Sequence, residues 1–268
     1  MDTSAYSALI RIRPPNPGAS PATSIARGDR PSPVRCALRR IAGSNPLPGA
    51  LVGLTMVTGM LDVISFLGLG KVFLAMMTGN VIFLGAAVGG TAGLSAAREV
   101  LAFACFATGI VIGARTERFA AQRARRHWFF LAMSAEIALL AGAVAAVWLM
   151  PSGSDASQYV AIALLALAMG ARCATVRRLG VTDMPVTVGV TGALIALVHD
   201  SPLAGAPASA FKGRRLGMVL AMGTGAAFGA FLMGNAGLRW ALVAVLLCVV
   251  VITVAVRLHP RHPVVTDR

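Results

Sequence analysis

The sequence predicts an all-α, polytopic transmembrane helix bundle, and its composition gives the first reason. Of the 268 residues, 57% are hydrophobic and only 13% are charged, and the mean hydropathy is +0.76. A soluble domain is about half apolar and about a quarter charged, so this chain lacks the charge to cover a water-exposed surface. Its length suits about six to eight crossings, because each needs about 20 mostly apolar residues.

The chain is strongly basic, with 24 Lys and Arg against 10 Asp and Glu and a formal net charge of +14. The basic residues lie between apolar runs, without interleaved aromatic residues and without a separate basic domain. This distribution is typical of cytoplasmic loops that face anionic lipid. We therefore expect the lipid bilayer as a partner, and no nucleic acid.

Three regions follow from the distribution of apolar residues. Residues 1–46 hold seven Arg, many Pro and Ser and no apolar run, so we expect a disordered cytoplasmic tail rather than a secretory signal. A start codon placed too far upstream would also explain such a segment. A transmembrane domain is predicted over 47–257, with halves at about 47–150 and 158–257, and a short tail over 258–268.

Eight apolar segments make up the predicted transmembrane domain. They cover about 49–69, 72–88, 100–114, 128–150, 159–176, 186–198, 216–233 and 240–256. The segment over 186–198 is too short to span a bilayer comfortably. A Gly-rich turn over 234–237 separates the last two segments.

Basic residues tend to stay in the cytoplasm, and this rule restricts how the segments cross. The N-terminal tail and the loops at 115–127, 177–183 and 212–215 are basic, whereas the loop at 151–158 is slightly acidic. Eight full crossings cannot place all the basic loops on one side.

The conflict disappears if the segments over 72–88 and 186–198 dip into the membrane and return. The sequence therefore predicts about six full crossings plus two short, re-entrant segments, with a cytoplasmic N-terminus. Seven crossings, with 72–88 spanning and the N-terminus outside, remain open.

Three motifs recur at a nearly constant separation, which favours an internal repeat. They are Thr-Gly at 78 and 191, Gly-x-x-x-Gly at 109 and 225, and Trp at 128 and 240, with separations of 113, 116 and 112 residues. Because each half has three crossings, the halves would have opposite orientations. Inverted repeats of this kind build many transporters, whose sites lie where broken helices meet near the midplane.

The short segments supply the candidate site residues: Thr78, Gly79, Asn80, Thr191 and Gly192. Gly allows a close approach to a ligand, and Thr caps half-helices. The start of a half-helix presents N–H groups and a positive dipole end to an anion or polar solute. Tight helix packing is an equally weighted alternative for these residues.

The spacing of four glycines indicates helix packing. Gly109, Gly113, Gly225 and Gly229 have the small-xxx-small spacing that brings helices close together in lipid.

Three ionisable residues lie within predicted crossings: Asp62, Glu136 and Arg172. Such residues normally pair or line a wet cavity, because an unpaired charge in the membrane is costly. Asp62 and Arg172 occupy roughly matching places in the two halves, so we expect them to pair. The alternative is that Arg172 reaches toward Arg177 and Arg178 at the membrane surface, while Asp62 is protonated or bonded within its helix.

The sequence shows no sign of catalysis or metal binding. The four cysteines are far apart, at positions 36, 105, 173 and 248, and form no metal-binding spacing. Zinc-protease, serine-hydrolase and nucleotide-binding motifs are missing. His199-Asp200 could transfer protons, but a solvated helix end is the favoured interpretation. We expect no enzyme, no cofactor and no metal.

Two stretches carry a family resemblance. Asp62-Val-Ile-Ser65-Phe66, followed by Met77-Thr78-Gly79-Asn80, resembles the YoaK-like family of bacterial membrane proteins of unknown function, as does the second half from Ala168 to Gly192. The resemblance covers about 47–257 and implies membrane residence and little more, because the family has no established substrate. We expect the bacterial inner membrane. At Arg172-Cys173 the family pattern usually has Gln-Asn, so a polar site formed by those amides would be altered here.

The resulting hypothesis is a transporter or channel for a small polar or anionic solute, with the site at the two Thr-Gly segments. A non-transporting membrane scaffold or regulatory protein is the alternative. Its oligomeric state, including a homo-oligomer, is left open by the sequence.

Overall fold

The computed structural model describes residues 47–120, 125–151, 153–179, 190–200 and 212–258, and all regular structure within these ranges is helical. The helices are α2 (Leu47–Gly68), α3 (Met77–Val88), α4 (Ala96–Ala120), α5 (Arg125–Leu149), α6 (Asp155–Leu179), α7 (Val190–His199) and α8 (Lys212–Leu258). The predicted tails over 1–46 and 259–268 lie outside the described residues.

Five helices, α2, α4, α5, α6 and α8, are long and apolar enough to cross a membrane. Helices α3 and α7 have 12 and 10 residues and are too short to span about 30 Å of hydrocarbon at 1.5 Å per residue. The protein is therefore a helical membrane bundle, as the sequence predicts.

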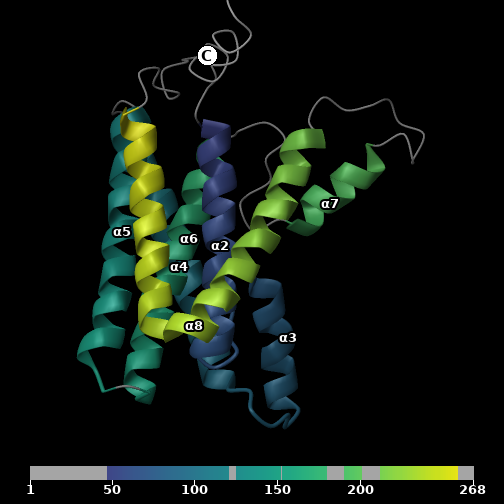
Figure 1. The fold of residues 1–268 in the computed structure, drawn as a ribbon, viewed down its shortest axis with the longest axis vertical. Coiled ribbons are helices and arrows are strands. Elements are labelled where there is room, and N and C mark those ends of the chain that lie inside the picture. The colour runs from purple at the N-terminus through teal and green to yellow at the C-terminus, as the bar shows by residue number, and fades with distance from the viewer. Residues whose placement is uncertain (1–46, 121–124, 152, 180–189, 201–211, 259–268) are drawn as a thin grey trace, which may run out of the picture. The chain divides into compact units, whose positions relative to one another are not determined.

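Helix α8 is long enough for two crossings. Its 47 residues would extend about 70 Å if straight, more than twice the hydrocarbon thickness. Gly237 interrupts it with φ 73° and ψ 177°, a conformation that glycine adopts without a steric penalty. Helix α8 accordingly bends back as two arms, and its second arm runs beside α5 (Figure 1). The turn predicted over 234–237 is this single break, with helix on both sides.

Backbone contact at glycines joins α2 to the first arm of α8. A Cβ atom at Gly59 would lie 2.3 Å from the Met222 carbonyl oxygen, and one at Gly225 would lie 2.0 Å from the Met56 carbonyl oxygen. Only glycine leaves room for backbones at this distance. The next turn repeats the contact between Gly229 and the Met60 backbone.

Helices α4 and α6 meet in the same way. A Cβ atom at Gly109 would lie 2.2 Å from the Leu167 carbonyl oxygen, and one at Gly170 would lie 2.0 Å from the Phe106 carbonyl oxygen. Gly113 continues this interface against the Ala171 backbone. The four glycines of the small-xxx-small motifs thus lie at two close backbone contacts between helices, with Gly59 and Gly170 on the facing helices.

These two interfaces correspond residue by residue. Each α6 position at its interface follows its α2 counterpart by 111 residues, and each α8 position follows its α4 counterpart by 116. Gly170 facing Phe106 thus repeats Gly59 facing Met222.

The helix ends gather into two groups, which fixes the direction of each helix. A buried cluster that includes Leu54, Trp128, Leu179, Met218 and Val256 joins the starts of α2, α5 and α8 to the ends of α6 and α8. We call this the basic end, since Arg177, Arg178 and Arg257 lie there.

The opposite end joins the remaining helix ends. Arg98 of α4 forms an ion pair with Asp155 of α6 at 2.8 Å and lies against Gly70, just after α2. Trp148 of α5 meets Trp240 of α8 edge to face. Helix α2 therefore ends where α4 begins, and the chain over 69–95, which includes α3, leaves and returns at one end. Figure 1 shows α3 toward this end and α7 toward the basic end.

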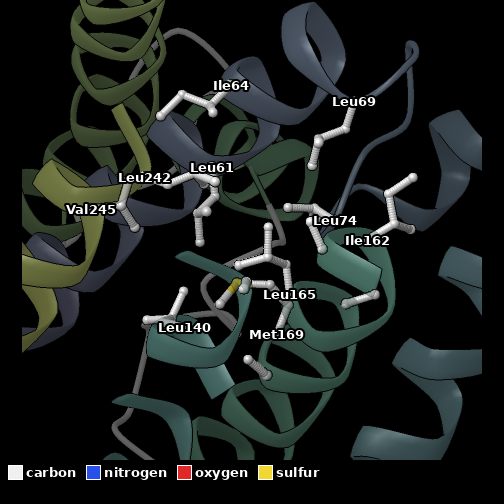
Figure 2. Packing of buried hydrophobic residues seen from close by; sticks show 14 of the residues in the cluster. Leu61, Ile64, Leu69, Leu74, Leu140, Ile162, Leu165, Met169, Leu242 and Val245 are labelled. Carbon is white, nitrogen blue, oxygen red and sulfur yellow. The ribbon is translucent and has the colours of Figure 1, made fainter. Parts of the chain in front are cut away.

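Apolar side chains from α2, α5, α6, α8 and the loop before α3 fill the centre of the bundle (Figure 2). Leu61, Leu74, Leu165 and Val245 belong to this core and are fully buried. Leu74 is in the loop rather than a helix, so the loop before α3 is anchored in the core.

We expect Gly225→Ala to destabilise the bundle, because its methyl group would overlap the Met56 carbonyl. Overpacking of this kind typically costs about 1–3 kcal/mol. Thermal unfolding in detergent would measure the loss. Gly223→Ala is the matched control, since no described atom beyond its chain neighbours and its own helix backbone lies within 4 Å of its Cβ position and alanine is the better helix former. Equal melting temperatures for the two variants would contradict the close contact.

Candidate functional site

The loop between α2 and α3 is held by the side chain of Asp62. Its Oδ1 atom accepts hydrogen bonds from the backbone N–H groups of Leu74 and Ala75, both at 2.8 Å. Ser65, one turn later, donates to the Val72 carbonyl at 2.7 Å. Asp62 and Ser65 are buried, so they supply the loop with partners that water cannot provide at this depth.

Asn80 fixes the same loop from the side of α3. Its Oδ1 atom accepts from the Phe73 N–H at 2.8 Å, and its Nδ2 atom donates to the Phe73 carbonyl at 2.6 Å. The Phe73 ring stacks on Phe66 and Phe83, with centroids 5.3 and 5.6 Å apart. The backbone groups of Phe73, Leu74 and Ala75 that face Asp62 and Asn80 are therefore paired where the chain turns into α3.

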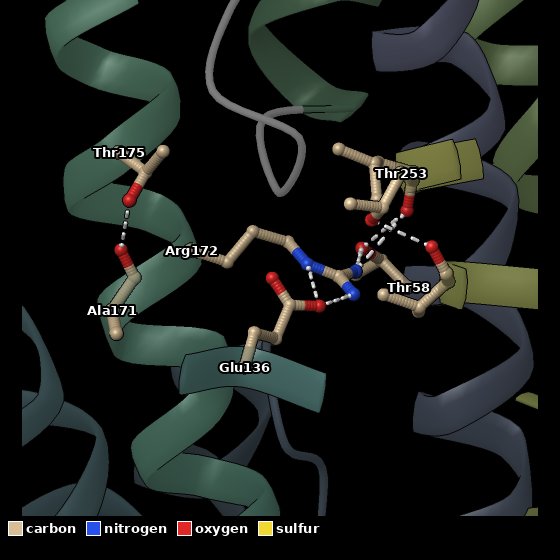
Figure 3. A network of polar contacts seen from close by, with 8 residues as sticks. Thr58, Glu136, Ala171, Arg172, Thr175 and Thr253 are labelled. Atoms are coloured by element: carbon tan, nitrogen blue, oxygen red, sulfur yellow. Dashed lines mark hydrogen bonds and ion pairs between the residues drawn. The ribbon is translucent and has the colours of Figure 1, made fainter. Parts of the chain in front are cut away.

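A second polar network joins α2, α5 and α6 around Arg172 (Figure 3). The Arg172 guanidinium forms an ion pair with Glu136 through Nε, at 2.9 Å, and through Nη2. Its Nη1 atom donates to Thr58 Oγ1 at 3.1 Å and to the Leu54 carbonyl at 3.3 Å. Arg172 and Glu136 are each 1% exposed, so both charges are compensated inside the bundle.

The predicted pair between Asp62 and Arg172 does not form, because each side chain has other partners. Arg172 contacts α2 at Leu54 and Thr58, which lie eight and four residues before Asp62, or about 12 and 6 Å along the helix. Helices α2 and α6 also finish at opposite ends of the bundle, so matching positions in the two halves lie at different depths. The alternative that Arg172 reaches toward Arg177 does not hold either, since its guanidinium points into the core.

A cavity of about 560 Å³ lies between the starts of α3 and α7 and the sides of α4 and α6. Its walls come from residues 75–79 and Ile82, from Phe106 and Ile110 of α4, from Cys173, Ala174 and Arg177 of α6, and from Thr191 of α7. Thr78, Gly79 and Thr191 are therefore brought to one cavity from segments more than 100 residues apart.

Other predicted site residues lie outside the cavity wall. Asp62, Asn80 and Arg172 are buried. Asp62 and Asn80 bond to the loop before α3, and Arg172 bonds to Glu136, so they hold the elements around the cavity in place. Gly192 is exposed beside Thr191 but does not line the cavity. The close approach at Gly79 is to the Phe73 ring, 2.7 Å from its Cβ position.

Sequence reasoning missed the walls contributed by α4 and α6. Phe106 and Ile110 are four residues apart, and Cys173, Ala174 and Arg177 share one face of α6, so helical spacing could have grouped each set. Arg172 points into the core whereas Cys173 faces the cavity. Of these two adjacent residues, only Cys173 lines the cavity.

Helix α7 is attached to α8 by Arg215. This side chain donates to the Ala196 carbonyl at 2.8 Å and to Asp200 at 2.5 Å. The hydrogen bond from Arg215 lowers the pKa of Asp200 below its usual value. His199 lies 3.1 Å from Asp200 with an exposed ring, so the pair sits at a solvated helix end. The described residues hold no cluster of three potential metal ligands.

Comparison with known proteins identifies the family of this chain. Residues 50–255 match the family model described as "Protein of unknown function (DUF1275)". The chain belongs to the DUF1275 family. It is also 30% identical over 149 residues to "UPF0700 transmembrane protein YoaK" of Bacillus subtilis (strain 168), which covers 55% of this chain and 64% of that protein. No solved structure matches.

The hydrogen bonds give the first of the two stretches that carry the family resemblance, from Asp62 to Asn80, a physical interpretation in this DUF1275 protein. Asp62, Ser65 and Asn80 each bond to the backbone of the loop over 69–76. The residues that carry the YoaK-like resemblance therefore build the approach to α3, and Thr78-Gly79 is the part that faces the cavity.

We expect Asp62→Leu to destabilise the protein strongly, because it leaves the N–H groups of Leu74 and Ala75 without an acceptor. Each unpaired buried group costs about 1–3 kcal/mol. Asp62→Asn keeps an acceptor oxygen and should lose much less. Thermal unfolding of the two variants in detergent would compare them. If Asn were as damaging as Leu, the carboxylate charge rather than the loop hydrogen bonds would be the important property.

Glu136→Gln should also lower stability, since it leaves the Arg172 charge buried without its counter-ion. Removing one partner of a buried pair costs about 3–5 kcal/mol. The double variant Glu136→Leu with Arg172→Met removes both charges and should melt closer to the wild type than Glu136→Leu or Arg172→Met alone. Additive losses within about 0.5 kcal/mol in this double-mutant cycle would show that the pair is not coupled.

Proposed function

We propose that this protein is a transporter or channel for small solutes in the bacterial plasma membrane, with the cavity between α3 and α7 as its site. The observation that carries the proposal is the convergence of Thr78, Gly79 and Thr191 on one cavity. Ligand pockets of about 300–1,000 Å³ are the usual size for small molecules. Paired short helices near a substrate site are typical of transporters.

The proposal includes an inverted internal repeat. The contacts of α2 with α8 and of α6 with α4 repeat at fixed sequence separations, which supports a relation between the halves. The short helices α3 and α7 occupy corresponding places in the chain order, each after the first long helix of its half. Opposite orientation of the halves is supported by α2 and α6 finishing at opposite ends.

The proposal also includes six crossings with a cytoplasmic N-terminus. Helices α2, α4, α5 and α6 and the two arms of α8 would each cross once. The basic end collects Arg177, Arg178 and Arg257, and the positive-inside rule favours the cytoplasm for that end. Helices α3 and α7 would then enter from opposite sides without crossing.

No enzymatic role is part of the proposal. A scaffold is the competing function, because the buried hydrogen bonds of Asp62, Ser65 and Asn80 would serve a packed scaffold equally well. The two functions differ in one physical property, since a transporter needs water in the cavity and a scaffold does not.

Cysteine labelling tests this difference. We expect Thr78→Cys and Thr191→Cys, each in a chain without native cysteines, to react with a water-soluble, membrane-impermeant thiol reagent in membrane vesicles. Val251→Cys is the lipid-facing control, since Val251 is 64% exposed in the middle of the second arm of α8, and it should stay unlabelled.

The result also reports the side of access. Faster labelling of Thr191→Cys from the cytoplasmic side would agree with the proposed orientation. If both cavity positions were as unreactive as Val251→Cys, the cavity would be dry and the transporter proposal would fail in favour of a scaffold.

A further inference from the structure

We infer that the cavity binds a small organic anion with an apolar body, with the anionic group beside Arg177 and the start of α3. This inference rests on the proposed function and specifies the class of its ligand. Three properties of the wall carry it: its single charge, its helix start and its apolar sides.

Arg177 is the one charged side chain that lines the cavity among the described residues. It forms no hydrogen bond or ion pair within the described part of the chain, although its neighbour Arg178 donates to the Glu117 carbonyl at 2.8 Å and lies over the Trp128 ring. The two adjacent arginines are thus used differently. Arg178 joins α6 to neighbouring helices, whereas Arg177 has no partner among the described residues and lines the cavity.

The start of α3 adds to the positive potential. Met77, Thr78 and Gly79 form its first turn and line the cavity. The Met77 and Gly79 N–H groups already donate to the Ala75 and Met76 carbonyls, at 3.1 and 2.9 Å, so the helix start contributes through the positive end of its dipole, which favours an anion. The Thr78 and Thr191 hydroxyl groups offer further donors. Guanidinium, helix start and hydroxyl groups together match a carboxylate or sulfonate.

The rest of the wall is apolar, which restricts the body of the ligand. Ile82, Phe106 and Ile110 line it together with Met76 and Met77. A bare inorganic anion would leave most of about 560 Å³ unfilled. A sugar-like solute would lose hydrogen bonds to water against this surface without regaining them.

The described lining offers nothing that would neutralise a cation. No Asp or Glu side chain is part of it. Asp62 does not line the cavity. Its Oδ1 atom accepts hydrogen bonds from the N–H groups of Leu74 and Ala75. A cationic ligand would therefore meet Arg177 without a counter-charge.

Protection of native Cys173 tests the inference. In purified protein with the other three cysteines changed to Ser, the rate of Cys173 modification by a small neutral maleimide is measured with millimolar benzenesulfonate. Benzenesulfonamide and phenyltrimethylammonium serve as neutral and cationic probes of similar size. Benzenesulfonate should slow modification by a factor of 1 + [L]/Kd, about tenfold at about ten times Kd, and the other two should have little effect.

Two variants separate a specific site from general charge. Arg177→Gln should abolish protection by benzenesulfonate, while Arg115→Gln should retain it. Arg115 is exposed near the end of α4, carries the same charge and does not line the cavity. The melting temperature with and without benzenesulfonate gives a second readout, and it should rise in the wild type and in Arg115→Gln but not in Arg177→Gln.

The outcomes distinguish the ligand class from the function. Protection by the neutral or cationic probe, or none by benzenesulfonate in either readout, would overturn the anion site while leaving a wet cavity and the transporter proposal intact. Protection that Arg177→Gln retains would also overturn it. Uptake of labelled benzenesulfonate into proteoliposomes tests transport separately. If benzenesulfonate protects Cys173 but shows no Arg177-dependent uptake, the anion site would be upheld and transport contradicted.

Discussion

The absence of water in a bilayer is the constraint on which this structure depends. A chain that enters the hydrocarbon region and turns there must find partners for every backbone N–H and carbonyl group. The loop before α3 meets this requirement through Asp62, Ser65 and Asn80, which together bond to Val72, Phe73, Leu74 and Ala75. Without these side chains α3 could not begin inside the bundle, and the cavity wall formed by Thr78 and Gly79 would not exist.

Much of the fold could be predicted because lipid makes composition and spacing unusually informative. Long apolar runs correspond to α2, α4, α5 and α6, and the small-xxx-small motifs correspond to the closest backbone contacts. Gly59 and Gly170 were not predicted as contact positions, since a single glycine within an apolar run has no spacing to identify it. The break at Gly237 was expected only as part of a longer turn, because its positive φ depends on the angle between the two arms of α8.

The site was predicted in part, and the reason for the rest is geometric. The Thr-Gly motifs marked two places on the cavity wall, but sequence matching suggested that Asp62 and Arg172 should also meet. Helices α2 and α6 finish at opposite ends of the bundle, so similar positions along the two helices need not lie beside each other. Arg172 instead forms an ion pair with Glu136 of α5, which lies beside it in the bundle. The contributions of Phe106 and Arg177 depend on which faces of α4 and α6 turn toward α3. Those faces adjoin the glycine contacts between α4 and α6, since Phe106 and Ala174 belong to both the contact and the cavity wall.

The reciprocal glycine contacts also have a consequence for biosynthesis. The glycine face of α2 packs against α8, and Met222 follows Gly59 by more than 160 residues. At about 5–20 residues per second, α2 exists for roughly 8–33 s before its partner is made. Helix α4 meets α6 after a shorter delay, because Leu167 follows Gly109 by fewer than 60 residues. During synthesis α4 and α6 can therefore pack before α2 and α8. Helix α2, the first of the described helices to be made, waits longest for the helix that it packs against.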